Sequence, residues 1–171
     1  MSSKDQNLSH YSLDVQNRSD LKIGIVTSDW NEDITLQLLS ACKETLMKEG
    51  ILESHVYEIH VPGAFELPTG ARMLDDKNNL DAVICLGCII KGETHHDQYI
   101  SQAVANGIMQ LGVLRSKPFI FGVLTPNNIE QARERTGGIH GNKGVEAAAT
   151  AIKMATLKRE LKTSSTRIGF S

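Results

Sequence analysis

Short apolar segments alternate with longer amphipathic ones along most of this chain, and this alternation constrains the fold more than any other feature. Residues 81–90 (DAVICLGCII) are apolar almost throughout, which is typical of a strand covered on both faces. Residues 34–49 instead carry Leu38, Cys42 and Leu46 on one face of a helix. Strands that alternate with helices pair in parallel through right-handed crossovers. The sequence therefore predicts a three-layer α/β/α sandwich around a central four-stranded parallel sheet, a flavodoxin-like fold.

The other elements follow from the same pattern. Further strands are expected near residues 23–26, 55–61 and 118–124, and further helices near residues 66–74, 100–111, 128–135 and 145–162. Gly50 occupies the position of a left-handed helix cap, and Pro68 is tolerable only in a first helical turn. Residues 137–144 are rich in glycine and are expected to form a flexible loop.

The length of 171 residues and the 40% share of hydrophobic residues fit a single domain. Residues 1–20 are mostly polar and have no sustained periodicity, so we expect an arm that is flexible or ordered by a neighbour. Residues 21–162 form the predicted domain, and residues 163–171 form a polar C-terminal tail.

Charge and cysteine content exclude several classes of protein. With 18 Lys and Arg against 20 Asp and Glu, the chain has no positive field to attract nucleic acid or an anionic membrane. No apolar stretch approaches the roughly 20 residues of a bilayer span, and no export signal follows Met1, so we expect a cytoplasmic protein. The three cysteines make no disulfide framework. Cys85 and Cys88 are expected on opposite faces of a strand, and no metal site is predicted.

Ligands of open α/β sheets bind outside the carboxyl ends of the strands, so the loops at those ends are the candidate sites. In residues 91–97 (KGETHHD), Gly92 permits close approach of a ligand, and Thr94 can cap the next helix together with Asp97. The free N–H groups of the helix start favour a phosphate, and a histidine beside it is suited to proton transfer. Alternatively, the loop only caps a helix and its histidines are solvated.

Three other loops carry candidate residues. Trp30, the only tryptophan, precedes Asn31, which suits stacking on a heteroaromatic ring, although a hydrophobic plug at the end of the sheet is an equal alternative. Residues 62–66 offer N–H groups and the Glu66 carboxylate to sugar hydroxyls, or that carboxylate only complements a helix dipole. The basic, glycine-rich residues 133–144 fit neither the Walker A pattern nor the dinucleotide fingerprint.

Four segments occur in order at these loops and strand ends. They are residues 61–68 (VPGAFELP), 86–96 (LGCIIKGETHH), 119–125 (FIFGVLT) with 128–132 (NIEQA), and 141–144 (GNKG) with 146–148 (EAA). Any one of them is weak evidence, but four in the right order are not accidental. From about residue 22 to residue 157, the chain resembles the 6,7-dimethyl-8-ribityllumazine synthase family.

The resemblance implies an enzyme of the penultimate step of riboflavin biosynthesis. It would condense 5-amino-6-(D-ribitylamino)uracil with 3,4-dihydroxy-2-butanone 4-phosphate, release phosphate and water, and need no cofactor or metal. A non-catalytic protein of the same fold that binds lumazine or flavin is the main alternative, since such a protein needs aromatic walls but no proton shuttle or phosphate clamp. A flavodoxin-type electron carrier is a further alternative.

The resemblance also implies roles for individual residues. His96 matches the catalytic histidine that transfers protons. The ribitylaminouracil would be held by Trp30, which stands where the family usually has Phe, and by Asn31, Ala64, Phe65, Glu66, Cys88, Ile89, Ile90 and Phe121. The phosphate would be held by Gly92, Glu93, Thr94 and Arg135, with Lys143 as a supporting residue.

Enzymes of this kind build each pocket between adjacent subunits of a homopentamer, and the resemblance implies that a neighbour supplies Phe121 and Arg135. Some members assemble twelve pentamers into a sixty-subunit cage, and riboflavin synthase is a candidate partner. In the family, an N-terminal segment can extend the sheet of the next subunit, which would give residues 1–20 a purpose. Ile139 stands where many members have a lysine, and Glu93 where Gly or Ala is common.

Overall fold

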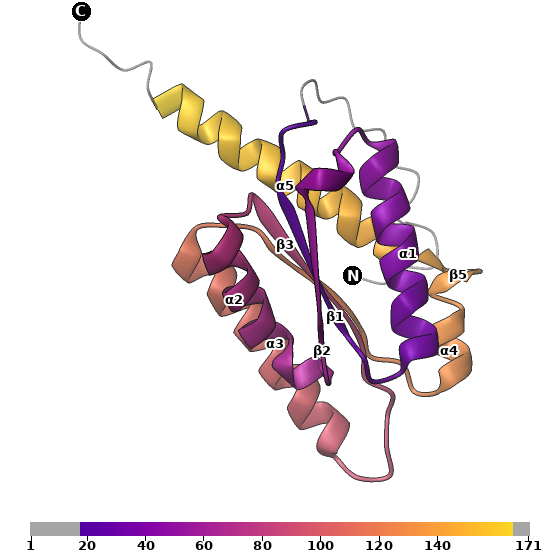
Figure 1. The fold of residues 1–171 in the computed structure, drawn as a ribbon. Coiled ribbons are helices and arrows are strands. Elements are labelled where there is room, and N and C mark those ends of the chain that lie inside the picture. Colours follow the sequence, from indigo (N-terminus) through magenta and orange to yellow (C-terminus); the bar gives the residue numbers. More distant parts are fainter. Residues whose placement is uncertain (1–17, 166–171) are drawn as a thin grey trace, which may run out of the picture.

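Four parallel strands form the centre of the structure (Figure 1), a computed structural model that describes residues 18–165. The strands are β1 (Ile23–Ser28), β2 (Val56–Val61), β3 (Ala82–Cys88) and β4 (Phe119–Leu124). They lie in the order β2-β1-β3-β4, and every neighbouring pair is parallel. The two central strands, β1 and β3, are buried along their whole length, as their apolar sequences predict.

Helices cover both faces of the sheet, which confirms the predicted three-layer α/β/α architecture. Helices α1 (Glu32–Lys48) and α5 (Lys143–Ser165) cover one face, and α2 (Leu67–Asn78) and α3 (His96–Arg115) cover the other (Figure 1). Shorter elements complete the connections: η2 (Glu53–His55), η3 (Ala64–Glu66), α4 (Ile129–Arg133), β5 (Thr136–Gly138) and β6 (Gly141–Asn142). None of the helices within residues 18–165 has the length and apolarity that crossing a membrane requires.

Several boundaries differ from those expected. Helix α2 runs four residues beyond the predicted end at Leu74, because Asp75 is buried beneath it and Asn79 supplies a left-handed cap with φ 49°. The glycine-rich residues 137–144 were expected as a loop but contain the β5–β6 hairpin. Its turn needs the positive φ of Gly137 (125°) and Gly141 (72°). Gly50 has φ 89°, as predicted for a cap.

A compact seam joins α5 to α1 on one face of the sheet. Ala148, Ala151 and Ile152 on α5 are fully or almost fully buried in the same cluster as Leu38 of α1. Small side chains on α5 let the two helices approach closely. The approach is closest at Gly144, where a Cβ atom would lie 2.1 Å from the backbone oxygen of Leu38.

Charged side chains are concentrated at the end of the sheet where the parallel strands begin. The buried Asp75 carboxylate accepts a hydrogen bond from Leu80 N (3.2 Å) and pairs with Lys117 and Arg115. This cluster fixes the end of α2 against the segment that enters β4. Because it lies away from the carboxyl ends, it serves the fold rather than the candidate site.

The last residues of the predicted N-terminal arm contact the domain itself. Arg18 pairs with Glu49, and Asp20 pairs with Arg159 at 2.7 Å. The hydrogen bond from Arg159 lowers the pKa of the Asp20 carboxyl below its usual value. Residues 1–17, which make up most of the arm, lie outside the described residues, as do residues 166–171 of the predicted tail.

Replacing Gly144 with alanine should destabilise the fold, because the added methyl group meets the backbone of α1 rather than a side chain that can move. We expect the free energy of unfolding in urea to fall by about 3 kcal/mol, the upper range for overpacking. Gly112→Ala is the matched control, since a Cβ atom there lies at an ordinary 3.5 Å from Lys117 O. It should leave stability unchanged or raise it by up to about 1 kcal/mol through helix propensity. Equal stability of the two variants would contradict the role given to the α1–α5 seam.

Candidate active site

The loop after β1 is tied to both neighbouring strands. Asp29 N donates to Val61 O at 2.8 Å and Trp30 N donates to Pro62 O at 3.1 Å, which continues the β1–β2 pairing beyond the sheet. On the other side, Asn31 Nδ2 donates to Cys88 O at 2.8 Å. Asn31 precedes α1 in the left-handed conformation with φ 63°, which turns the chain sharply at this point.

Trp30 itself is presented to solvent. Its side chain is 73% exposed, so within one chain it is not the hydrophobic plug that was the alternative in the sequence analysis. Three hydrogen bonds fix the loop around the indole, yet no core residue among residues 18–165 covers the ring. This arrangement leaves a flat aromatic face free to stack on a planar ligand.

The loop after β2 presents a second ring at the same edge of the sheet. Ala64 is buried, whereas Phe65 is 57% exposed and Glu66 is exposed. The Glu66 carboxylate lies back towards Gly63, where a Cβ atom would come within 3.1 Å of Oε2. Pro68 lies in the first turn of α2, as predicted. The loop therefore offers an aromatic face and a carboxylate next to each other.

The ends of β3 and β4 continue side by side in the same way. Ile89 N donates to Leu124 O at 2.8 Å, and Lys91 N donates to Pro126 O at 3.0 Å. Cys88 and Ile89 are buried, and Ile90 is half-buried against the core. These residues thus offer a ligand mainly backbone atoms.

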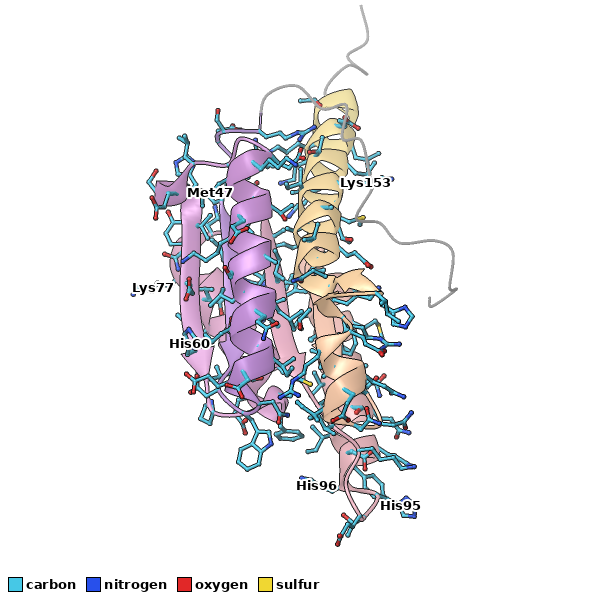
Figure 2. The ribbon with its side chains drawn as sticks, turned by 90° about the vertical axis from the view of Figure 1, so that its right-hand side faces the viewer. Met47, His60, Lys77, His95, His96 and Lys153 are labelled. Carbon is cyan, nitrogen blue, oxygen red and sulfur yellow. The ribbon has the colours of Figure 1, made fainter. Side chains whose placement is uncertain are left out.

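Residues 91–96 form an exposed loop that leads into α3. His95 and His96 lie together at one end of the molecule, at the start of this helix (Figure 2). A Cβ atom at Gly92 would have no neighbour within 4 Å, so the packing of this chain does not require glycine there. The free space beside the backbone is what close approach of a ligand would need.

The predicted capping of α3 by Thr94 with Asp97 is wrong. The residue that precedes the helix is His95, one position later than the capping pattern requires, and it makes no side-chain cap. Thr94 Oγ1 accepts only a long contact of 3.4 Å from His96 N. In the first turn of α3, Gln98 N and Tyr99 N donate to His95 O at 3.1 and 3.3 Å, so this turn offers an anion fewer free N–H groups than the sequence predicted.

Phe121 and Arg135 lie on other elements than the loop that carries Trp30. Phe121 lies on the edge strand β4, where its side chain is 43% exposed. It pairs with Cys85 of β3 and lies three residues before the end of β4 at Leu124. Arg135 follows α4 in the α1/α5 layer, and its Nη1 donates to Gln131 O at 2.9 Å. His96, in contrast, begins a helix of the α2/α3 layer.

Comparison with known proteins identifies the family. The family model described as 6,7-dimethyl-8-ribityllumazine synthase matches residues 20–159. A protein of that name from Cytophaga hutchinsonii is 52% identical over 154 residues, which cover 90% of this chain and 97% of the relative. Another from Porphyromonas gingivalis is 46% identical over 160 residues, 93% of this chain and 99% of the relative. The chain belongs to the 6,7-dimethyl-8-ribityllumazine synthase family.

The lumazine synthase resemblance found in the sequence is thereby confirmed, and so is the fold that it implied.

Lys143, the supporting residue of the predicted phosphate site, already has a partner in this chain. Its Nζ contacts both carboxylate oxygens of Glu146 at 2.8 Å, and its backbone N donates to Arg135 O at 2.9 Å. Lys143 thus fixes the backbone at Arg135, while Glu146 offsets its charge.

Cys85 and Cys88 lie on opposite faces of β3, as the strand spacing predicts. Cys85 packs in the cluster under α2 and α3, and Cys88 in the cluster under α1 and α5. Burial raises the pKa of both thiols to about 12. Within residues 18–165, no group of three or more His, Cys, Asp and Glu side chains is placed to hold a metal ion.

His60 contacts the loop that carries Trp30, although no sequence motif indicated it as a site residue. His60 Nδ1 lies 3.0 Å from Asp29 Oδ1. The available signal was the alternation of β2, in which polar residues at 58 and 60 interrupt an apolar strand. Alternation marks an exposed face of an edge strand, but it does not indicate which loop the side chain reaches.

The buried thiols should be unreactive in the folded lumazine synthase family member. Cys42 shares the raised pKa of about 12, again through burial. We expect native protein at pH 8 to react with Ellman's reagent at a small fraction of the rate of free cysteine, because the thiolate is the nucleophile. Unfolding in guanidinium should then release all three thiols. Rapid reaction of one thiol in the native protein would show that a strand end opens in solution.

Proposed function

We propose that this chain catalyses the condensation of 5-amino-6-(D-ribitylamino)uracil with 3,4-dihydroxy-2-butanone 4-phosphate to 6,7-dimethyl-8-(D-ribityl)lumazine. The observation that carries the proposal is the family match over residues 20–159, which includes all the loops at the carboxyl edge of the sheet. The exposed Trp30, Phe65 and His96 at that edge support it. Nothing in the comparisons favours the non-catalytic binding protein.

The pyrimidine substrate stacks on Trp30 in this proposal. Phe65 adds a second apolar surface, while Asn31, Ala64 and Glu66 border the ring and the ribityl chain. The backbone of residues 88–90 runs along the edge of the uracil and supplies hydrogen-bonding groups. Exposure of both rings and burial of the side chain of Cys88 fit this division of roles.

The phosphate of the second substrate binds at the start of α3. The N–H groups of residues 92–94 and the positive end of the helix dipole favour an anion there, and the unoccupied space beside Gly92 lets it approach. Arg135 of an adjacent subunit supplies the cation that clamps the departing phosphate. The Glu93 carboxylate must point outward, since it would otherwise repel the phosphate.

His96 transfers protons between the two substrates. The amine at C5 of the uracil attacks the ketone and forms an imine with loss of a first water. The imine loses phosphate, the enol rearranges, and the ribityl-bearing nitrogen closes the ring with loss of a second water. No step requires a covalent bond to the protein, so positioning and proton transfer account for most of the rate enhancement. An exposed imidazole at the helix start is accessible to both substrates.

The positions of Phe121 and Arg135 support a site shared between subunits. Both have roles in the family site, yet they lie on other elements of the chain than Trp30. Met109, Val113 and Leu114 of α3 are 55%, 70% and 80% exposed, which supports a subunit interface over this helix. We propose a homo-oligomer built from pentamers. The cage, the arm as an added strand, riboflavin synthase as a partner and the cytoplasmic location stay predictions.

Replacing His96 with alanine should slow turnover without a comparable loss of binding. We expect kcat for lumazine formation to fall by about 100-fold or more, the usual contribution of general acid–base catalysis. The dissociation constant of the product should change by less than about threefold. His95→Ala is the matched control, because it removes the adjacent exposed imidazole. Unchanged turnover in His96→Ala would remove His96 from the mechanism, and a protein that binds lumazine but never forms it would be the non-catalytic alternative.

Mixed oligomers test whether two chains build one site. His96→Ala and Arg135→Ala subunits should each be inactive, whereas refolding them together should restore part of the activity. Activity returns because some pockets then receive intact His96 and intact Arg135 from different chains. Native mass spectrometry establishes that the subunits have mixed. Mixed particles without recovered activity would place the complete site within one subunit.

A further inference from the structure

Stacking on Trp30 requires a mechanism that keeps the indole in place, because the ring itself is 73% exposed. The backbone bonds of Asp29 N to Val61 O (2.8 Å) and of Trp30 N to Pro62 O (3.1 Å) fix the main chain of the loop but not its exposed side chains. Asp29 is exposed and directly precedes the tryptophan.

His60 is the side chain that contacts Asp29. Figure 2 shows His60 beside α1, towards the end of the molecule where His95 and His96 lie. Its Nδ1 is 3.0 Å from Asp29 Oδ1, and its Nε2 is 3.3 Å from Glu58 Oε1. Glu58 Oε2 accepts in turn from Lys43 Nζ at 2.8 Å. A chain of side-chain contacts thus runs from α1 across β2 to the residue before Trp30.

The strand pattern explains why His60 is available for this contact. Ile59 and Val61 face the α2/α3 layer, so Glu58 and His60 face the α1 layer. Because β2 is an edge strand, α1 leaves these two side chains partly open to solvent. The register pairs His60 with Thr27, so Asp29 lies two residues further along the chain on the same face, where the imidazole reaches it.

Both nitrogens of the ring face carboxylate oxygens. A neutral imidazole can donate to only one of them, whereas the imidazolium donates to both. The contact of Nδ1 with Asp29 bridges the strand to the loop. Among the described residues, His60 is the one basic side chain that contacts Asp29.

We propose that His60 is a positioning residue for the substrate pyrimidine: it holds Asp29, and through it the plane of Trp30. The proposal rests on the proposed function, since it assumes that Trp30 is the stacking surface. His60 does not touch the reacting atoms and acts only through the loop. Its effect falls on the affinity for the pyrimidine and not on proton transfer.

The size of the effect follows from exposure. The side chains of His60 and Asp29 are 40% and 60% exposed, and exposed pairs contribute little because solvent screens them. We therefore expect about a threefold to fivefold loss of affinity when the pair is broken. The loss should be larger at low ionic strength.

Trp30 fluorescence measures this directly, because the chain has one tryptophan. Titration of the intact protein with 6,7-dimethyl-8-ribityllumazine should quench the emission of Trp30. In His60→Gln, the dissociation constant from this titration and the KM for the ribitylaminouracil should rise about threefold to fivefold. The KM for the butanone phosphate and kcat should stay within about twofold.

Four further variants make the test specific. Asp29→Asn should reproduce the loss, and the double variant with His60→Gln should lose no more than either single one. His60→Lys, which places an ammonium group near Asp29, should recover part of the affinity. His55→Gln is the matched control at the other end of β2, where His55 Nδ1 contacts Ser19 O at 2.9 Å, and it should match the unaltered protein.

The outcomes separate the two proposals. If lumazine neither quenches Trp30 nor forms from the two substrates in the unaltered protein, the proposed function fails. If it quenches and forms there, but His60→Gln and Asp29→Asn bind with unaltered affinity, only the positioning role is overturned. Strictly additive losses in the double variant would also overturn it, because the two residues would then act independently.

Discussion

Backbone hydrogen bonds between parallel strands continue past the ends of the sheet, and the candidate site depends on them. The β1–β2 pairing extends to the bond between Trp30 N and Pro62 O, and the β3–β4 pairing extends to the bond between Lys91 N and Pro126 O. Because all four strands are parallel, these extensions meet at a single edge. Loops that are far apart in the sequence are therefore held at fixed offsets, which preorganisation of two substrates requires.

The opposite edge of the sheet carries the charges that stabilise its start. The N–H groups of Lys22 and Leu80 donate to the carboxylates of Asp81 (2.9 Å) and Asp75 (3.2 Å). Arg159 bonds Asp81 at 2.9 Å, so α5 is anchored to the same region. Buried or partly buried carboxylates are retained here because each has cationic and N–H partners. Because these charges stabilise the fold at the edge where the strands begin, the side chains exposed at the carboxyl edge are not needed for folding.

The layers of the fold and the loops of the site were predictable from the sequence, because both follow from periodicity. Apolar runs such as residues 82–88 and helical spacing such as Leu38–Cys42–Leu46 report burial directly. The start of α3 was not predictable. Thr94 and Asp97 have the spacing of a capping box, but the helix begins one residue later than that spacing requires. The β5–β6 hairpin was not predicted for a related reason. Its two glycines with positive φ permit a turn, but glycines in a sequence do not by themselves indicate a hairpin. The contact between His60 and Asp29 depends on tertiary register, which local patterns do not contain.

Exposure of aromatic rings at two separate places connects the fold to its assembly. Trp30 and Phe65 lie beyond the ends of β1 and β2, whereas Phe121 lies within the other edge strand, with β3 between β1 and β4. A chain that worked alone would leave all three rings in water, although burying apolar surface gains about 25 cal/mol per Å². A ligand stacked on Trp30 and covered by Phe121 of an adjacent subunit would bury both rings at once. Ligand binding and subunit association would then draw on the same apolar surface, so each would favour the other.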